Sequence, residues 1–373
     1  MTQQRDLDQA ATKATSPVGS GSLALPELSA TGSFRLRKRV VAICVTVLIA
    51  VILLSAASGA AGLPVAGVAR SMLNLIPGVD LATSLDSRAE AVLFQIRLPR
   101  TILGVLVGAA LGMAGASFQG VFRNPLADPY LLGVSAGAGF GAVLALGFGL
   151  DVGWGPVSAV PAAAFIGAVV AVMASVLVAR GSWTSPATLL LSGVAVAALF
   201  SAAQTYALQK LDETRAREVL SWLFGRLATS GWEQVLLLLP YVIVCGGLLI
   251  MLRRHLDVMR LGDDEARALG LNPARSRFLI ITAATLLTAA AVAVSGLIAF
   301  VGLVVPHLVR LLTSHSYRVI VPLSALVGGS FMALVDIGAR TVVAPAELPV
   351  GIITAFVGAP FFALVLRRSR RGA

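Results

Sequence analysis

The chain is built from long apolar runs separated by short charged connections. Nine stretches of at least 17 residues contain no Asp, Glu, Lys or Arg, at residues 40–69, 101–122, 129–150, 152–179, 181–209, 234–252, 278–309, 319–335 and 348–366. An α-helix needs about 20 apolar residues to cross the hydrocarbon core of a bilayer. The pattern therefore predicts an all-α membrane protein that crosses the bilayer many times.

The run 278–309 is too long for one ordinary span, since it contains 32 residues. The pair Ser295-Gly296 offers a natural break, because Gly weakens the interior of a helix. Split there, the run gives two helices, and the second continues to about Leu312. We therefore expect ten transmembrane helices, an even number that places both ends of the chain on the same side.

The distribution of charged residues agrees with this topology. If both termini lie inside, the inner segments hold 20 of the 29 Lys and Arg but 8 of the 18 Asp and Glu. Positive residues are favoured on the cytoplasmic side of a membrane. The net charge of +11 thus belongs to one membrane face, and it does not require a nucleic-acid partner. We expect a multi-pass protein of the plasma (cytoplasmic) membrane, surrounded by lipid, with both termini in the cytoplasm.

The ten spans form one transmembrane domain, residues 40–367, with short tails. Residues 1–39 are rich in Ser, Thr, Gln, Gly and Ala, which predicts a disordered, basic cytoplasmic N-terminal tail. Residues 253–277 form the longest charged cytoplasmic loop, and residues 368–373 form a second basic tail. We expect no cleavable signal peptide, because the first apolar run begins late and is long.

The composition excludes an ordinary soluble enzyme. The chain has 13% charged and 57% hydrophobic residues, whereas soluble domains carry about 25% charged residues. None of the three Lys follows Gly, so the sequence contains no phosphate-binding P-loop. Cys44 and Cys245 lie apart in apolar runs and the three His are scattered, which favours packing roles over a metal site. We assign no catalytic residue, no metal site and no cofactor.

Glycines and helix breakers inside the apolar runs indicate a transporter rather than a simple anchor. Gly104, Gly108 and Gly112 recur every four residues, a spacing that lets helices approach closely in lipid. Pro306 and Pro360 interrupt helices at membrane depth. Broken helices persist there where protein or a water-filled path covers the freed backbone groups.

The charged loop contains a segment that looks like a short helix. Three acidic residues follow Gly262, where the dipole of a helix favours negative charge in the first turn. Gly270 is placed to end the helix, and Asn272-Pro273 follows as a stop signal. A helix of one to two turns between two spans is either a solvated connection or a docking element for a cytoplasmic partner.

Three arginines oppose the charge trend on the outer face. Arg97 and Arg100 flank Pro99, and Arg340 lies four residues after Asp336, within reach of a helical ion pair. For Arg340 taken alone, a structural role in holding a helix end is as well supported as a contact with a partner. Arg97 and Arg100 together favour contact with an acidic external partner, because Arg forms bidentate bonds with carboxylates.

Three long blocks of the chain resemble the FecCD-type permeases, the membrane subunits of ABC importers for ferric siderophores, haem and cobalamin. The blocks are RLPRTILGVLVGAALGMAGASFQGVFRNPLADPYLLGVSAGAG (97–139), GLIAFVGLVVPHLVRLL (296–312) and AELPVGIITAFVGAPFF (346–362). The likeness runs from about residue 40 to the C-terminus. It implies a type II ABC importer permease fold with ten helices and both termini inside, in agreement with the charge count.

The resemblance also implies roles for particular residues. The segment LGDDEARALGL looks like the cytoplasmic coupling helix that fits a groove of the ATPase subunit. Its residues are Leu261, Gly262, Asp263, Asp264, Glu265, Ala266, Arg267, Ala268, Leu269 and Gly270. Arg97, Arg100 and Arg340 match arginines that meet acidic residues of a substrate-binding protein. A cytoplasmic gate is expected at Ser185, Pro186, Ala187 and Thr188, although this sequence differs from the gate of the cobalamin permease.

The partners implied by the resemblance are two cytoplasmic ABC ATPase subunits, an extracytoplasmic binding protein and a second permease subunit, identical or paralogous. The implied mechanism is alternating access, with a ferric siderophore as the expected cargo and haem or cobalamin as alternatives. A secondary transporter driven by an ion gradient is the rival class. Carboxylates buried in mid-helix would favour that rival, and the sequence has a cytoplasmic docking segment instead.

Overall fold

The computed structural model describes residues 38–59, 62–149, 158–180, 185–227 and 231–369, which are helical and contain no β-strand. The long helices are α2 (Lys38–Ala57), α5 (Leu98–Val121), α6 (Val134–Gly147), α7 (Ala159–Val178), α8 (Pro186–Leu208), α10 (Trp232–Tyr241), α11 (Gly247–Met259), α13 (Pro273–Ser295), α14 (Val301–Leu312), α15 (Tyr317–Thr341) and α16 (Val350–Ser369). Short helices between them are α3 (Val65–Leu73), α4 (Ser87–Val92), η2 (Pro129–Leu132), α9 (Glu213–Leu223) and α12 (Asp263–Ala268).

Two π-helical turns make longer continuous helices. The turn η1 (Leu93–Arg97) joins α4 to α5, and η3 (Val242–Gly246) joins α10 to α11 directly after Pro240. Proline removes a backbone donor and clashes with the preceding turn, and π-turns commonly absorb such disturbances in a helix. The second span therefore begins earlier than the apolar run at residue 101 indicates, because the helix already starts at Ser87.

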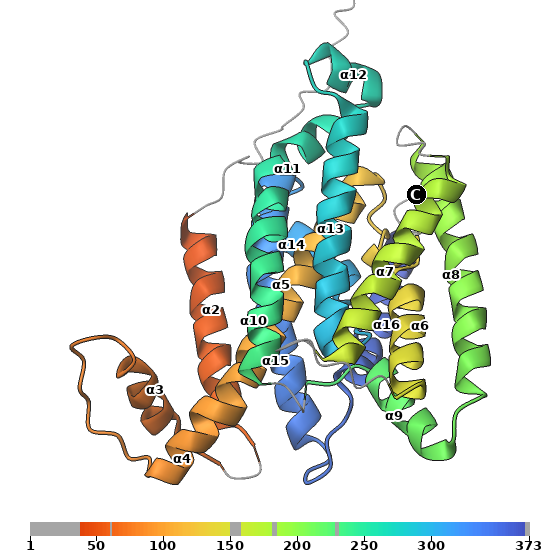
Figure 1. Cartoon of the computed structure of the whole chain (residues 1–373). Helices are drawn as coiled ribbons and strands as arrows, with labels where there is room; N and C mark the ends of the chain where they lie inside the picture. The colour runs from red at the N-terminus through yellow and green to blue at the C-terminus, as the bar shows by residue number, and fades with distance from the viewer. Residues whose placement is uncertain (1–37, 60–61, 150–157, 181–184, 228–230, 370–373) are drawn as a thin grey trace, which may run out of the picture. The chain divides into compact units, whose positions relative to one another are not determined.

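The prediction of an all-α membrane protein is confirmed. Seven continuous helices of the described residues are long and apolar enough to cross a membrane, and α6, α14 and α16 are shorter apolar helices. In the bundle, α12 lies at one end, beyond α11 and α13, whereas α3, α4 and α9 lie at the opposite end (Figure 1). Ten crossings remain a prediction. The expected N-terminal tail falls on residues outside those described, except that Lys38 and Arg39 already belong to α2.

The first apolar run is not one helix, contrary to what its length suggests. Helix α2 ends at Ala57, and α3 begins at Val65 after Pro64, which precedes its first turn. Gly59 adopts φ +149°, a backbone conformation that L side chains rarely adopt. Proline favours the first turn of a helix but cannot continue one. These two residues divide an apolar run that hydropathy alone treats as continuous.

The predicted break in the run 278–309 is confirmed. Helix α13 ends at Ser295, Gly296 takes φ +71°, and α14 begins five residues later. The backbone of this connection finds partners elsewhere in the chain. The Arg226 amide donates to the Ser295 carbonyl at 2.8 Å, and Tyr130 Oη donates to the Ile298 carbonyl at 2.9 Å. Such partners allow a non-helical connection within an apolar protein.

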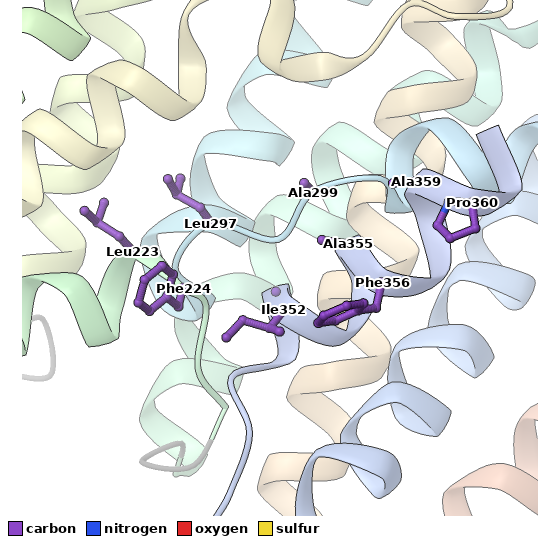
Figure 2. A pocket seen from close by; sticks show the side chains of 10 residues that line it. Leu223, Phe224, Leu297, Ala299, Ile352, Ala355, Phe356, Ala359 and Pro360 are labelled. Carbon is purple, nitrogen blue, oxygen red and sulfur yellow. The ribbon is translucent and has the colours of Figure 1, made fainter. Parts of the chain in front are cut away.

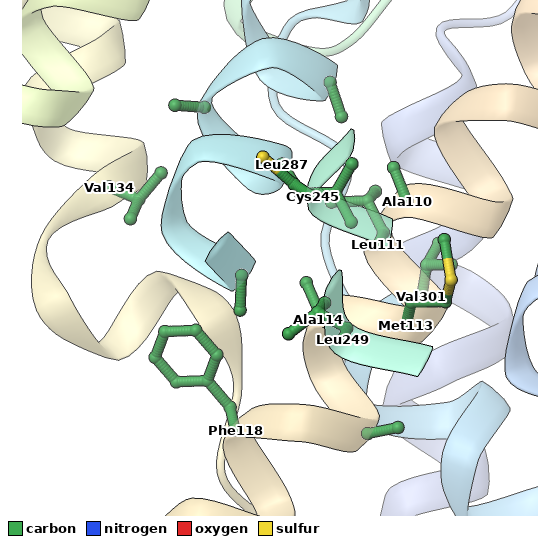
Figure 3. Close-up of a cluster of buried hydrophobic side chains, with 14 of the residues drawn as sticks. Ala110, Leu111, Met113, Ala114, Phe118, Val134, Cys245, Leu249, Leu287 and Val301 are labelled. Carbon is green, nitrogen blue, oxygen red and sulfur yellow. The ribbon is translucent and has the colours of Figure 1, made fainter. Parts of the chain in front are cut away.

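Helix α5 forms the centre of the packing. In the continuous helix Ser87–Val121, which contains α5, 83% of the most apolar stretch is buried, against 22% for α2 and for α8. Helix α5 packs on α13, α14 and α15. Figure 3 shows the side chains of this core, among them Ala110, Leu111, Met113, Ala114 and Phe118 of α5 beside Cys245, Leu249, Leu287 and Val301. The helices that carry the candidate sites are therefore held against one shared element.

Glycines of α5 allow its backbone to touch α15. A Cβ atom on Gly108 would lie 2.1 Å from the Gly328 carbonyl oxygen, and one on Gly112 would lie 2.4 Å from the Ser324 carbonyl oxygen. Real side chains do not approach that closely, so the contact requires glycine at these positions. The expected close packing along this glycine face is confirmed at Gly108 and Gly112.

The variant Gly108→Ala is expected to destabilise the fold by about 1–3 kcal/mol, because the new methyl group must push α5 away from α15. The measurement is the thermal unfolding of the purified protein in detergent. Gly104→Ala is the control, since its Cβ would meet Leu227 at an ordinary 3.4 Å. Equal unfolding temperatures for both variants would show that the close approach is not a constraint.

Candidate functional site

Three arginines meet at the end of the bundle that holds α4. Arg97 ends η1, Arg100 lies in the first turn of α5, and Arg340 lies in the last turn of α15. Together with Asp336 and Glu347 they form what we call the arginine cluster. The structure thus brings together all three predicted docking residues. It also buries them, with exposed fractions of 6%, 7% and 9%.

Arg97 and Arg340 cap the end of α2. The carbonyl groups at positions 55–58 lie at this helix end, where backbone acceptors lack helical partners. Arg97 donates to two of these carbonyl oxygens, at 3.2 and 2.8 Å, and Arg340 donates to the other two, each at 3.0 Å. Cations are also favoured at a helix C-terminus by the helix dipole. Both arginines therefore fasten α2 to its neighbours.

Arg100 is held between two carboxylates. It donates from Nε and Nη2 to Asp336 Oδ1, at 3.0 and 2.8 Å, and from Nη1 to Glu347 Oε1 at 2.9 Å. Arg340 approaches the other oxygen of Asp336 at 3.1 Å, as the i,i+4 spacing predicted. The side chain of Asp336 is 1% exposed, whereas that of Glu347 is 38% exposed. Docking by these arginines stays a prediction, and the contacts give them a structural role.

The variant Asp336→Asn is expected to destabilise the protein strongly, because it removes the buried charge shared by Arg100 and Arg340. Breaking a buried ion pair from one side typically costs about 3–5 kcal/mol. Thermal unfolding in detergent measures the loss. Glu347→Gln is the matched control, with a smaller expected loss, since Glu347 is partly exposed and Asp336 remains in place. Losses of the same size would contradict a central role for Asp336.

The predicted coupling segment forms a helix of six residues, α12, between two glycines. Gly262 precedes it with φ +140° and Gly270 follows it with φ +80°, both in the region that favours glycine. Asn272-Pro273, expected as a stop signal, instead begins the next helix: the Asn272 side chain accepts from the Arg275 amide. Ala266 is fully buried against the rest of the chain. The short helix is therefore confirmed.

One carboxylate anchors α12 to the bundle. Asp263 accepts hydrogen bonds from Arg277 at 2.9 and 3.1 Å, and it also pairs with Arg123 from the end of α5. Arg277 is 1% exposed. In contrast, Leu261 and Leu269 at the two ends of α12 are 64% and 65% exposed. The segment is thus fixed on its inner side and presents apolar side chains outward.

The anchoring of α12 is expected to depend on the charge of Asp263. Partial burial acts to raise the pKa of Asp263, but the hydrogen bond and charge of Arg277, and then those of Arg123, outweigh it and hold the pKa below its ordinary value. In the unfolded chain the pKa of an Asp is near 3.9. Because the folded-state pKa is lower, the charge of Asp263 stabilises the fold at pH values above 3.9, and this stabilisation is lost as the pH falls through the folded-state pKa.

Hydrogen exchange of the α12 amides measures this dependence. After correction for intrinsic rates, protection should stay constant from about pH 8 to pH 5, and Asp263→Asn should remove it across that range. The control is Asp264→Asn, because the Asp264 side chain is 94% exposed and pairs only with Arg267 in the described residues. Unchanged protection in Asp263→Asn would refute the anchor.

The predicted gate residues begin α8. Ser185 accepts a hydrogen bond from the Thr188 amide at 3.4 Å, the two hydroxyl oxygens lie 2.8 Å apart, and Pro186 occupies the first turn. Ser and Pro at these positions are typical of a helix start. Ala187 and Thr188 are exposed. A gating function for this turn stays a prediction.

An apolar cavity of ≈ 600 Å³ opens where three elements meet. Its walls come from the end of α9, the connection between α13 and α14, and α16, and the lining residues are Leu223, Phe224, Leu297, Ala299, Gly351, Ile352, Ala355, Phe356, Ala359 and Pro360 (Figure 2). Gly351 donates from its amide to the Phe224 carbonyl at 3.1 Å, which ties α16 to the end of α9. The lining has no charged residue.

Sequence reasoning missed three partners in these sites. Arg123 lies 140 residues from Asp263, and Glu347 lies 247 residues from Arg100, so spacing along the chain carries no signal for either pair. Arg277 is 14 residues from Asp263 in the same charged loop. A search for internal charge pairs within that loop could have found it. Among the described residues, no group of three His, Cys, Asp or Glu could hold a metal ion.

Comparison with known proteins places these features in context. The model of the FecCD transport family matches residues 47–368. The chain is 42% identical over 296 residues to the cobalamin import system permease protein BtuC of Halobacterium salinarum, covering 79% of this chain and 78% of that protein. It is 39% identical over 287 residues to the Fe(3+)-citrate import system permease protein YfmE of Bacillus subtilis, with coverage of 77% and 85%. A solved structure described as an inward-facing metal-chelate type ABC transporter aligns with a TM-score of 0.77 at 32% identity, over 89% of this chain and 100% of that one.

Proposed function

Because the chain belongs to the FecCD transport family, we propose that it is the transmembrane permease subunit of an ABC importer that carries a ferric siderophore into the cytoplasm. The family match across residues 47–368 is the observation that carries the proposal. ATP hydrolysis belongs to two separate cytoplasmic ATPase subunits. Both chain ends lie on their side of the plasma membrane, as the distribution of positive charge favours.

The helix α12 is the site where an ATPase subunit docks. Leu261 and Leu269 present apolar surface beside charged side chains, the mixture found at protein interfaces with an apolar centre and a polar rim. Asp263 ties α12 to Arg277 in the first turns of α13. A displacement of α12 is thereby passed to a long buried helix rather than absorbed by a loose loop.

The opposite end of the bundle receives the substrate-binding protein. The assigned docking residues are Arg97, Arg100 and Arg340. In the isolated chain their guanidinium groups already donate hydrogen bonds to acceptors of the same chain. A partner carboxylate could reach Arg100 by displacing Glu347, which is the more exposed of its two acidic partners. Docking would then alter the same cluster that fastens α2, α5 and α15.

The apolar cavity is part of the translocation pathway. Its volume of ≈ 600 Å³ lies within the range of sites for small molecules. Small and apolar walls suit a cargo whose metal is already wrapped by a chelator, because such a cargo needs no protein ligands. A second permease subunit, identical or paralogous, completes the pathway across a two-fold axis, and Ser185–Thr188 form the cytoplasmic gate of alternating access.

The expected cargo is supported by the names of related transporters rather than by the residues of the cavity. One relative is named for import of Fe(3+)-citrate, and the similar solved structure is described as a metal-chelate type transporter. The first name supports an iron complex as cargo, and cobalamin, for which another relative is named, is the alternative. Haem stays the alternative iron source, and the growth experiment below distinguishes the three.

The proposal predicts loss of growth when the gene is deleted and a ferric siderophore is the sole iron source. The wild-type gene should restore growth, and Leu261→Ser/Leu269→Ser should not, because polar side chains remove the apolar contact with the ATPase. Glu213→Gln, an exposed change on α9 at the opposite end of the bundle, should restore growth at equal membrane abundance. The transport rate of each variant is measured as uptake of ⁵⁵Fe-siderophore.

The outcomes separate the alternatives. A growth defect with haem alone assigns the haem branch, and a defect in cobalamin uptake alone assigns the cobalamin branch. Full uptake after deletion of the partner ATPase would refute an ABC importer and favour a transporter driven by an ion gradient. Full uptake by the Leu261→Ser/Leu269→Ser variant would refute docking through these leucines.

A further inference from the structure

The seam between α7 and α13 carries a second apolar cavity, separate from the pathway. It has a volume of ≈ 350 Å³ and is lined by apolar residues such as Val172, Leu177, Phe278 and Ile281, together with Thr282 and Thr285. The two helices pack side by side in the bundle (Figure 1). None of the residues that line this cavity lines the larger one. It is therefore a site distinct from the larger cavity.

The chain does not complete the wall of this cavity. Thr285 Oγ1 is buried without a hydrogen-bond partner in the described part of the chain, and Thr285 is 4% exposed. Thr288, one turn further along α13, instead donates to the Ala284 carbonyl at 2.7 Å. Buried hydroxyl groups normally find a partner. The unfilled space beside Thr285 is the cavity itself, which Thr285 lines together with Thr282.

The dimensions of the cavity match one leaflet of a bilayer. Its α13 wall runs from Phe278 to Leu286, which at 1.5 Å per residue is about 12 Å. A single leaflet contributes about half of the ~30 Å hydrocarbon core. Because α13 begins at the end that holds α12, the cavity lies in the half of the bundle next to α12.

Two arginines lie at that end of the two helices. Arg180 lies two residues past the end of α7, in a left-handed backbone conformation, and Arg275 lies in the first turn of α13, three residues before Phe278. Both are exposed, and neither guanidinium group has a hydrogen bond or ion pair with the described residues. Two cations at the same end of the two helices, beside an apolar cavity of leaflet depth, form an amphipathic site.

We infer that the α7–α13 seam binds an anionic phospholipid of the cytoplasmic leaflet, with an acyl chain in the cavity and the phosphate between Arg180 and Arg275. Apolar walls match the hydrocarbon chain, and arginine side chains form charge-assisted hydrogen bonds with phosphate oxygens. The cytoplasmic leaflet is also the leaflet that supplies anionic lipid. The inference requires that the chain spans a membrane, and it does not depend on the cargo.

The charges also distinguish lipid from a second copy of the chain. A subunit interface across this seam would bring four arginines toward one another, since each copy contributes Arg180 and Arg275. Like charges at an interface oppose association. A phospholipid instead brings a negatively charged phosphate to the two cations.

Native mass spectrometry of the full chain tests the inference. The protein is released from nanodiscs with equal parts of phosphatidylglycerol and phosphatidylcholine, and the bound lipid is identified. The wild type should retain phosphatidylglycerol. Arg180→Gln/Arg275→Gln should lose roughly 30-fold in this preference, about fivefold per arginine, as expected for about 1 kcal/mol per cation near an anionic surface.

The matched control removes two other exposed arginines. Arg39→Gln/Arg254→Gln causes the same loss of charge in the first turn of α2 and within α11, two helices that do not line the cavity. This control should retain the wild-type preference. Equal loss in both double variants, or none in Arg180→Gln/Arg275→Gln, would overturn the inference.

A second variant tests the cavity itself. Thr282→Trp fills the space between α7 and α13 and should release bound lipid without changing the number of subunits, whereas Ile43→Trp on exposed α2 should have no effect. If Thr282→Trp keeps its lipid but dissociates an oligomer, the seam is a subunit interface and the inference is wrong. Circular dichroism confirms that each variant is folded.

Discussion

Backbone groups that enter an apolar layer need hydrogen-bond partners, and most features of this chain follow from how it supplies them. The carbonyl groups at the end of α2 receive donors from Arg97 and Arg340. The break between α13 and α14 receives donors from the Arg226 amide and from Tyr130. Each unsatisfied group would cost several kcal/mol in hydrocarbon. Segments far apart in the sequence are therefore brought into contact at the end of α2 and at the break between α13 and α14.

The same requirement connects the candidate sites through α5. One end of this helix carries Arg100, which is held by Asp336 of α15, and the residue just beyond its other end, Arg123, pairs with Asp263 of α12. The helix between them packs against α15 with backbone contact at Gly108. A rigid, buried element with a charged contact at each end is suited to move as one body. Alternating access, as proposed here, needs such an element between the docking surface and the ATPase.

Hydropathy and charge predicted the helical class, the break at Ser295-Gly296 and the short helix α12, because each depends on local sequence. Hydropathy failed at the first apolar run, since the turn near Gly59 and Pro64 interrupts the helix without any charged residue. The arginine cluster could be predicted in part. The i,i+4 spacing identified the pair of Arg340 with Asp336, but the capping of α2 could not be foreseen. Its acceptors are backbone carbonyl groups, which every residue has, so no side-chain pattern marks them.

The apolar lining of the large cavity explains why the sequence does not identify the cargo. A hydrophobic pocket distinguishes ligands that differ by a methylene group by about 1–3 kcal/mol, and it discriminates weakly against added polar groups. Strong selection requires buried polar groups that must be paired, and the lining from Leu223 to Pro360 has no charged side chain. Relatives named for Fe(3+)-citrate and for cobalamin are 39% and 42% identical to the same chain. A pathway of this kind constrains size and wrapping, so in the proposed importer the choice among chelates must be made before the cargo reaches it, by the binding protein.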